Sequence, residues 1–276
     1  MSVKVADALR EAAAGLERAG CPSPRVDAEW LLADVLGTTR TGLYVTERPL
    51  EEGELRRFRG LVERRGTREP LAYVLGEWGF RRLTLAVDPR VLIPRPETEI
   101  VVERCLELLR PIEQPRVLDI GVGSGAIALA IADERSGARV VATDSSADAL
   151  AVAEANKARL ALNGRVELRQ GDLLAGARGP FDLVVSNPPY VAPEDVERLA
   201  PEVLHEPRGA LVGSGRQAEV AEAARAVLSP AGIVVLEVGD GQAPEVTAAL
   251  EALGYGEIRT TPDLAGRERV VEGRVP

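Results

Sequence analysis

Short apolar runs alternate with helical patterns after residue 115, and this alternation constrains the fold more than any other feature of the chain. Helical patterns lie at about residues 124–134, 147–160, 216–228 and 243–253. The apolar runs are RVLDIG, VVATDS, VELRQG, FDLVVS and IVVLEV. Strands that alternate with helices form a mostly parallel sheet, which binds ligands at the carboxyl ends of its strands. We therefore expect an α/β domain with its site at that edge.

Two more strand candidates, YGEIRTTPD and ERVVEGRV, follow the last helical pattern. A short loop joins them, so we expect an antiparallel pair at the end of the chain. Together with the five earlier runs, they predict a Rossmann-like, mostly parallel sheet of seven strands.

The front of the chain has a different pattern. Apolar residues at helical spacing predict helices over residues 3–19, 23–37, 51–64 and 70–75, which would form a small bundle. Residues 76–96 alternate apolar and polar side chains around Asp88-Pro89, which predicts a hairpin. We expect three parts, namely a helical domain over 1–75, a hairpin linker over 76–96 and an α/β domain over 97–276.

Two interpretations stay open for the proline-rich segment VLIPRPETE, which leads into a helix expected over residues 97–109. It is either a rigid linker or a cover that passes over an active site. We expect Glu97 and Glu99 to be carboxylates at the helix N-terminus, where the helix dipole stabilises negative charge.

Charge is unevenly distributed along the chain. The formal net charge is −9, but residues 1–96 carry 16 Lys and Arg against 14 Asp and Glu. The remaining residues carry 18 against 29, which argues against a phosphate-binding groove in the α/β part. For an arginine cluster in the front part, we favour a solvated helix face over contact with RNA or an acidic partner. Its members are Arg56, Arg57, Arg59, Arg64, Arg65 and Arg68.

Composition excludes several classes of protein. No apolar run approaches the roughly 20 residues that span a bilayer, and residues 1–20 form an amphipathic pattern without the apolar centre of a signal peptide. We expect a cytoplasmic monomer that binds neither a membrane nor, stably, nucleic acid. Cys21 and Cys105 are expected to be buried free thiols. His205 is the only histidine, so no metal site is expected, and its place beside Pro207 favours a structural role in a loop.

The first predicted strand ends in the glycine motif DIGVGSG, directly before a helix. Glycines let the backbone turn sharply and approach a ligand closely. The spacing is G-x-G-x-G rather than the G-x-G-x-x-G of dinucleotide-binding folds, which weakens a pyrophosphate interpretation. Asp144 ends the second strand, where a carboxylate can accept both hydroxyls of a ribose, and Asp172 follows the third, where an adenine amino group would bind. These positions predict a nucleoside pocket.

The fourth predicted strand ends in the turn Asn187-Pro188-Pro189-Tyr190. The prolines restrict φ and lack an N–H, so the turn is rigid and rich in acceptors. Such a turn suits a planar NH2 group, whose two hydrogens two carbonyls would accept while Tyr190 packs on its flat face. Since Asn-Pro and Pro-Pro are common turn dipeptides, a purely structural strand-ending turn is the alternative.

These motifs resemble those of S-adenosylmethionine-dependent methyltransferases that alkylate planar amino nitrogens. Across its whole length, the chain looks like the HemK-type release factor glutamine methyltransferases, through its helical front and the segments LIPRPETE, NPPY, HEPRGAL and GRERVVEG. The resemblance implies a methyltransferase sheet, S-adenosylmethionine as cofactor and the glutamine of a release factor's Gly-Gly-Gln loop as acceptor. It also implies that the front bundle and hairpin help to recognise the release factor.

The resemblance assigns roles to cofactor-binding residues. Asp144 would hold the ribose, and Asp172 with Leu173 the adenine, although some relatives place an aromatic where this chain has Leu173. Asn187 would also border the cofactor. The methionine end would lie against the motif residues Asp119, Gly121, Val122, Gly123, Ser124 and Gly125.

On the catalytic side, the resemblance implies that Asn187 and Pro188 hold the acceptor amide. We expect Pro188 and Pro189 to brace Asn187, with Tyr190 packed on the flat face of the acceptor. Asn187 Oδ1 and the Pro188 carbonyl would accept hydrogen bonds from the NH2 group, which favours the positive charge that develops on nitrogen. No general base stands out, and proton loss after transfer needs only water.

Three alternative functions stay open. A glutamine methyltransferase acting on a ribosomal protein would use the same turn. An N6-adenine methyltransferase of nucleic acid would need a basic groove and a base taken out of the stack, which the acidic α/β part disfavours. A nucleoside-sensing or RNA-binding module would not need a rigid acceptor turn.

Overall fold

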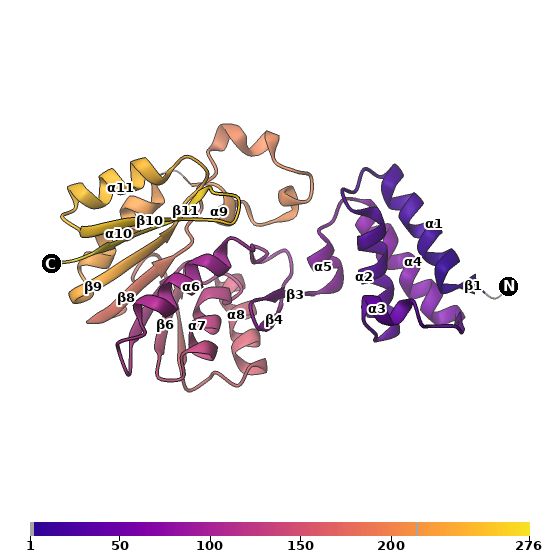
Figure 1. The fold of residues 1–276 in the computed structure, drawn as a ribbon, viewed down its shortest axis with the longest axis horizontal. Coiled ribbons are helices and arrows are strands. Elements are labelled where there is room, and N and C mark those ends of the chain that lie inside the picture. Colours follow the sequence, from indigo (N-terminus) through magenta and orange to yellow (C-terminus); the bar gives the residue numbers. More distant parts are fainter. Residues whose placement is uncertain (1–2, 214) are drawn as a thin grey trace. The chain divides into compact units, whose positions relative to one another are not determined.

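The computed structural model describes residues 3–213 and 215–276, which form two compact units. The N-terminal unit holds the described part of residues 1–76 together with Leu199–His205. The sheet unit holds Glu77–Arg198 and Glu206–Pro276. Figure 1 shows the chain coloured along its sequence.

The N-terminal unit is a helical bundle around one apolar core. Its helices are α1 (Val5–Arg18), α2 (Pro24–Leu36), α3 (Arg40–Leu43), α4 (Glu52–Gly66) and α5 (Leu71–Leu75). Pro24 begins α2, and Gly37 ends it in the left-handed conformation that glycine adopts without strain. Leu16, Leu31 and Phe58 are almost fully buried in the core. The four helices expected from sequence periodicity are therefore present.

Three short elements of this unit were not predicted. They are α3 and a pair of antiparallel strands, β1 (Val3–Lys4) and β2 (Pro49–Leu50). Elements of two to four residues carry no periodicity, so the sequence offered no signal for them.

A distant segment of the chain belongs to the N-terminal unit through buried charge. Glu202 lies in the Leu199–His205 segment and accepts hydrogen bonds from Arg65 Nη2 at 2.9 Å and Arg68 Nη2 at 2.6 Å. Arg65 also donates to Asp27 Oδ2 at 2.8 Å. Ion pairs, and not an apolar pattern, attach this segment to the N-terminal unit. Sequence periodicity therefore could not predict that it belongs there.

The arginine cluster pairs with carboxylates of its own unit. Each of the six arginines forms an ion pair there. The expectation of a solvated face suits Arg56, whose side chain is 70% exposed. It is wrong for Arg65, whose side chain is 3% exposed, because the facing carboxylates of Asp27 and Glu202 compensate its burial.

The sheet unit contains a seven-stranded sheet in the order β10-β11-β9-β8-β5-β6-β7. Only β11 runs antiparallel to its neighbours, β9 and β10. This confirms the predicted mostly parallel sheet with an antiparallel pair at the end of the chain. The strands are β5 (Arg116–Ile120), β6 (Arg139–Asp144), β7 (Val166–Gln170), β8 (Phe181–Ser186), β9 (Leu228–Glu237), β10 (Gly256–Pro262) and β11 (Glu268–Arg274).

Helices cover both faces of this sheet (Figure 1). One face packs against α6 (Thr98–Leu108), α7 (Ala126–Glu134) and α8 (Ala147–Arg159). The other packs against α10 (Arg216–Arg225) and α11 (Ala243–Ala252). Central strands buried on both sides read as continuous apolar runs, as β8 and β9 do.

Three short helical elements of the sequence after NPPY were not predicted. They are η1 (Pro193–Arg198), η2 (Val203–His205) and α9 (Arg208–Leu211). Like the short elements of the bundle, they are too short to show a periodic pattern of apolar residues.

The predicted hairpin exists, but its turn is elsewhere. Strands β3 (Glu77–Phe80) and β4 (Leu83–Ala86) pair antiparallel, and the chain turns at Arg81-Arg82, where Arg81 has a φ of 52°. The expectation of a turn around Asp88-Pro89 was wrong. Asp88 instead accepts a hydrogen bond from the Arg90 backbone N–H in a separate tight turn. The hairpin belongs to the sheet unit, because its apolar side chains join the core beside α7.

Neither cysteine forms a disulfide, since Cys21 and Cys105 are both buried free thiols. Within residues 3–213 and 215–276, no group of three or more His, Cys, Asp or Glu side chains could hold a metal ion. None of the described helices combines the length and apolar content that a membrane crossing requires.

The buried ion pair of Arg65 predicts a stability effect. Arg65→Met should lower the free energy of unfolding of the N-terminal unit by about 3–5 kcal/mol, because it leaves Asp27 buried without its partner. Arg57→Met is the matched control. Since Arg57 is 58% exposed in its pair with Asp34, its loss should cost less than about 1 kcal/mol. Urea unfolding of the full chain measures both, and equal effects would contradict the account.

Candidate active site

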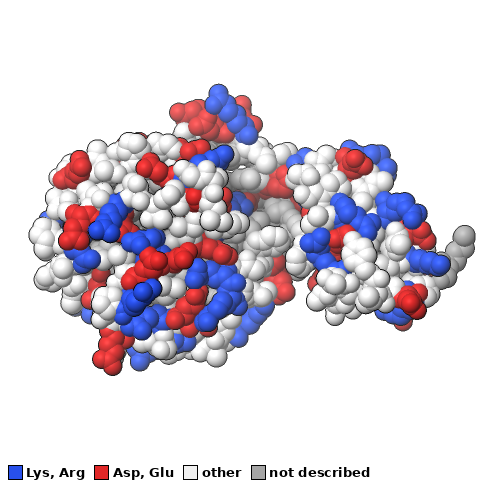
Figure 2. Space-filling view, viewed as in Figure 1, with Lys and Arg blue, Asp and Glu red and all other residues white. Residues whose placement is uncertain are grey.

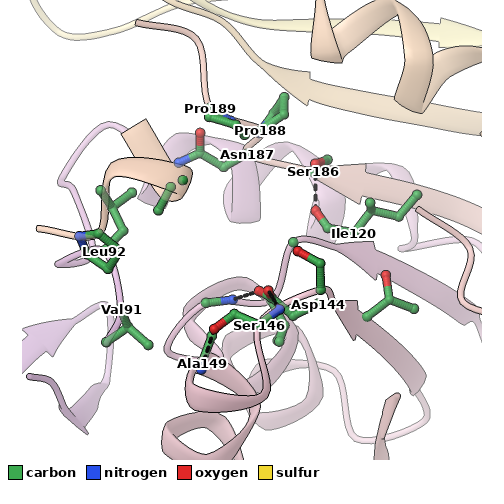
Figure 3. A pocket seen from close by; sticks show the side chains of 18 of the residues that line it. Val91, Leu92, Ile120, Asp144, Ser146, Ala149, Ser186, Asn187, Pro188 and Pro189 are labelled. Atoms are coloured by element: carbon green, nitrogen blue, oxygen red, sulfur yellow. Dashed lines mark hydrogen bonds between the residues drawn. The ribbon is translucent and has the colours of Figure 1, made fainter. Parts of the chain in front are cut away.

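A cavity of about 610 Å³ lies at the carboxyl ends of the parallel strands. Strand ends and loops supply its walls, and Figure 3 shows Asn187 across the cavity from Asp144, with Leu92 on a third side. Its size is within the range of small-molecule and cofactor sites, about 300–1,000 Å³. The sheet edge expected from the sequence therefore carries a pocket.

The glycine loop after β5 forms one wall of this cavity. The backbone N–H groups of Gly121 and Val122 both donate to the Thr143 carbonyl at 2.9 Å, so the loop bends tightly around the end of β6. Gly125 is the N-cap of α7 with a φ of 91°, and a Cβ there would lie 2.6 Å from Leu129 Cδ1. Only glycine fits this turn. The loop residues Gly121, Val122, Gly123 and Ser124 line the cavity.

Asp144 ends β6 and faces the cavity opposite Asn187 (Figure 3). Its Oδ2 accepts from the Gly123 backbone N–H at 2.9 Å, and its Oδ1 accepts from the Ser146 N–H at 2.9 Å. These bonds fix the carboxylate and tie it to the glycine loop. A carboxylate can accept about four hydrogen bonds, so it can also accept those of two ligand hydroxyls.

Asp119 lies behind the cavity rather than in its wall. It is 1% exposed, and its Oδ2 accepts from the backbone N–H of Ala128, in the first turn of α7, at 3.0 Å. Its Oδ1 has no hydrogen-bond partner among the described residues. Burial raises the pKa of Asp119 to about 8, with a smaller contribution from the charge of Asp144. Asp119 thus supports the helix that carries the glycine loop.

Asp172 and Leu173, predicted beside an adenine, both line the cavity. Asp172 Oδ1 accepts from Arg216 Nη2 at 2.6 Å, and this bond lowers the pKa of Asp172. Leu173 has a φ of 48°, and its carbonyl accepts from the Thr143 hydroxyl at 2.6 Å. Arg216 also lines the cavity, and sequence reasoning missed it because an arginine that begins an amphipathic helix carries no special pattern.

The NPPY turn supplies the wall opposite Asp144. Asn187, Pro188 and Pro189 line the cavity. Asn187 Nδ2 donates to Thr98 Oγ1 at 3.2 Å, and Thr98 Oγ1 in turn donates to Glu237 Oε2 at 2.7 Å. The structure therefore brings Asn187 to the site together with two residues that the sequence did not single out.

Tyr190 is placed differently from its neighbours in the turn. Its hydroxyl lies 3.5 Å from Glu237 Oε1, and its backbone carbonyl accepts from Gln242 Nε2 at 2.9 Å. Burial raises the pKa of Tyr190 to about 12. Since the ring is outside the cavity wall formed by the described residues, its expected packing on the flat face of an acceptor stays a prediction.

The segment VLIPRPETE passes along the cavity. This favours its interpretation as a cover of the site over that of a rigid linker. Val91, Leu92, Pro94 and Arg95 line the cavity. Buried Glu206 holds this segment, because it accepts from the Ile93 backbone N–H at 3.0 Å and pairs with Arg95. Sequence reasoning missed Glu206.

The remaining charged candidates lie at structural positions. Glu97 is the N-cap of α6, and Glu99 lies in its first turn, where its carboxylate accepts from the Arg81 backbone N–H at 2.8 Å. His205 ends η2 in the N-terminal unit and is exposed. It is absent from the described lining of the cavity.

The fold and the strand-end site define a Rossmann-like methyltransferase. The family model "Methyltransferase small domain" matches residues 98–229, and the "PrmC N-terminal domain" model matches residues 7–76. A solved structure of a methyltransferase from Pyrococcus furiosus has the same fold. It superposes with a TM-score of 0.50 over 69% of this chain and 87% of that chain, at 19% identity.

Curated relatives identify the family. A release factor glutamine methyltransferase of Deinococcus radiodurans is 44% identical over 99% of this chain and 99% of its own length. One of Caulobacter vibrioides is 40% identical over 99% of this chain and 97% of its own length. The chain belongs to the release factor glutamine methyltransferase family.

The buried Asp119 predicts a dependence of stability on pH. The pKa of Asp119 is about 8 in the folded chain and about 4 in the unfolded chain, so between these pH values the folded chain binds a proton that the unfolded chain does not. The contribution of Asp119 to the free energy of unfolding is therefore lost as pH rises from about 4 to about 8. Asp119→Asn keeps the acceptor for Ala128 N–H and removes the charge, so it should gain stability relative to the native chain as pH rises.

Urea unfolding at pH 5 and pH 8.5 measures this difference. Asp240→Asn, at an exposed aspartate, is the control and should follow the native chain at both pH values. A stability difference for Asp119→Asn that is the same at both pH values would contradict the prediction.

Proposed function

We propose that the protein transfers a methyl group from S-adenosylmethionine to the side-chain nitrogen of the glutamine in a release factor's Gly-Gly-Gln loop. The observation that carries this proposal is the anchored Asn187 amide. Its nitrogen is bonded to Thr98, so its oxygen is the atom left to accept a hydrogen bond from an NH2 group in the cavity. We take glutamine as the acceptor and the release factor as the substrate from the names of the curated relatives.

The residues of the cavity fit S-adenosylmethionine. Asp144 would accept hydrogen bonds from the ribose hydroxyls, while Ile120 and Leu173 offer apolar contact to the adenosyl part. The glycine loop would let the backbone approach the methionine end closely. The bound cofactor would supply a methyl group on a sulfonium, a good electrophile for a weakly nucleophilic amide.

Orientation is the main contribution of the protein side chains in this reaction. Asn187 Oδ1 and the Pro188 carbonyl would accept the two hydrogens of the glutamine NH2 and leave its nitrogen lone pair directed at the methyl group. Aligning two reacting groups can supply much of the acceleration of a displacement. The same acceptors favour the positive charge that develops on nitrogen. Water suffices to remove the proton afterwards.

We assign recognition of the release factor to the N-terminal unit and catalysis to the sheet unit. We also place the reaction in the cytoplasm, with one copy of the chain as the acting unit. The basic balance of residues 1–96 and the acidic balance of the remainder support separate tasks for the two parts.

An N6-adenine methyltransferase of nucleic acid is the second candidate, because an adenine amino group is also a planar NH2. The distribution of charged side chains disfavours this candidate. On the face shown in Figure 2, basic and acidic side chains intersperse rather than gather into one basic stripe. Glutamine methylation of a ribosomal protein would use the same chemistry, and the relatives named for release factors favour the latter substrate.

Removing the Asp144 carboxylate should weaken cofactor binding. Asp144→Ala should raise the dissociation constant for S-adenosylmethionine by about 10- to 100-fold, since charged hydrogen bonds are worth about 1.5–3 kcal/mol each. Calorimetry measures the affinity, and thermal unfolding checks that the variant folds. Asp148→Ala, on the exposed start of α8, should bind as the native chain does. Unchanged affinity in Asp144→Ala would remove this residue from the site.

Methyl transfer to glutamine is the direct test of the proposed function. Incubation of an intact release factor with labelled S-adenosylmethionine should place the label on the Gly-Gly-Gln glutamine, as mass spectrometry identifies it. A release factor with glutamate at that position should remain unlabelled, because a carboxylate has no NH2. Asn187→Ala should lower kcat far more than cofactor affinity. Label on adenine in DNA or RNA, with none on glutamine, would favour the second candidate.

A further inference from the structure

A buried carboxylate lies directly behind the NPPY turn. Glu237 ends β9 and is 1% exposed. In the parallel register of β8 and β9, Ser186 pairs with Leu236. Asn187, the first residue after β8, therefore lies next to Glu237, the last residue of β9. A charged group that closes an apolar strand is costly to bury. The proposed reaction does not use it directly, so its presence needs another explanation.

Thr98 connects this carboxylate to Asn187. Thr98 begins α6 and is 4% exposed. Its Oγ1 lies 2.7 Å from Glu237 Oε2 and 3.2 Å from Asn187 Nδ2. The three side chains come from three different elements and form one continuous chain of hydrogen bonds.

The chemistry of the three groups fixes the direction of these bonds. An ionised carboxylate only accepts, so the single hydrogen of the Thr98 hydroxyl points to Glu237. The Thr98 oxygen can then only accept from Asn187. An amide turned the other way would place two acceptors against each other. The ionised Glu237 therefore decides which of the two amide atoms of Asn187 faces Thr98 and which one remains for the cavity.

We propose that Thr98 and Glu237 are positioning residues for methyl transfer, which act through one another to turn Asn187 Oδ1 toward the acceptor amide. This inference rests on the proposed function, in which Asn187 Oδ1 accepts a hydrogen of the glutamine NH2. Neither residue needs to touch the acceptor. Together they convert a flat amide with two possible orientations into an acceptor with one.

These hydrogen bonds also make the orientation of the Asn187 amide depend on the protonation of Glu237. A protonated Glu237 can donate to Thr98, which frees the Thr98 hydrogen for Asn187 Oδ1 and turns the Asn187 NH2 group to the cavity. Two NH2 groups cannot bond to each other, so this state is inactive. Burial, the largest cause, and the charge of Glu97 raise the pKa of Glu237 to about 7, although Thr98, Arg269 and Tyr190 act in the opposite direction.

Substitution of Thr98 separates the role of its hydroxyl from that of its shape. Thr98→Val keeps the shape and should lower kcat by about 10- to 100-fold, the scale expected for a misaligned reactant. Thr98→Ser keeps the hydroxyl and should stay within about threefold of the native kcat. Cofactor affinity should be unchanged in both. Thr84→Val, at an exposed position of β4, controls for the substitution itself.

The pH dependence of kcat distinguishes positioning from simple packing. In the native enzyme, kcat should fall as pH decreases through about 7, where Glu237 takes up its proton. Thr98→Val should lose this dependence, because without the Thr98 hydroxyl the protonation of Glu237 no longer affects the orientation of Asn187. Glu237→Gln should lose it as well, and its melting temperature at pH 8 should rise because a buried charge is removed.

Side-chain NMR tests the orientation independently of turnover. The ¹H–¹⁵N resonances of the Asn187 NH2 group should shift with pH together with Glu237, and this shift should be absent in Thr98→Val. If the native enzyme transfers no methyl group to glutamine, the proposed function fails, and the NMR titration alone still decides the inference. Equal kcat in Thr98→Val and Thr98→Ser, or Asn187 resonances that ignore Glu237, would overturn it.

Discussion

Parallel pairing of neighbouring strands is the constraint on which the site depends. β5 pairs in parallel with both β6 and β8, and β8 pairs with β9, so four strands end at the same edge. Each strand then delivers one group of the site, namely the glycine loop, Asp144, Asn187 and Glu237. Register alone makes Ser186 a neighbour of both Ile120 and Leu236, which lie 66 and 50 positions away in sequence.

Buried carboxyl groups at this edge reduce the stability of the fold. Asp119 and Glu237 are both about 1% exposed carboxylates, and burial raises the pKa of each. An apolar side chain at either position would pack without this cost. Natural proteins accept such costs at functional sites, where orientation matters more than stability. Asp119 accepts a hydrogen bond from the start of α7 behind the glycine loop, and Glu237 accepts one from Thr98 behind the NPPY turn.

The sequence predicted the sheet and much of the cavity wall because both have local signals. Alternating strand and helix patterns give the sheet, and glycine or proline turns such as NPPY give the strand ends. Thr98, Glu206, Arg216 and Glu237 were missed because their roles depend on partners far away in sequence. One signal was available for Glu237, since a charged residue that ends the run IVVL is unusual in a buried strand. The hairpin turn was misplaced because Asp88-Pro89 is a stronger turn dipeptide than Arg81-Arg82.

Neutron diffraction would observe the orientation of the Asn187 amide directly. Crystals of the enzyme at pH 8, with the demethylated cofactor and a Gly-Gly-Gln peptide, would reveal the exchangeable hydrogens. We predict a deuterium on Asn187 Nδ2 directed at Thr98, one on Thr98 directed at Glu237, and Asn187 Oδ1 at about 2.7–3.2 Å from the glutamine nitrogen. An Asn187 amide with its oxygen facing Thr98 would contradict this prediction.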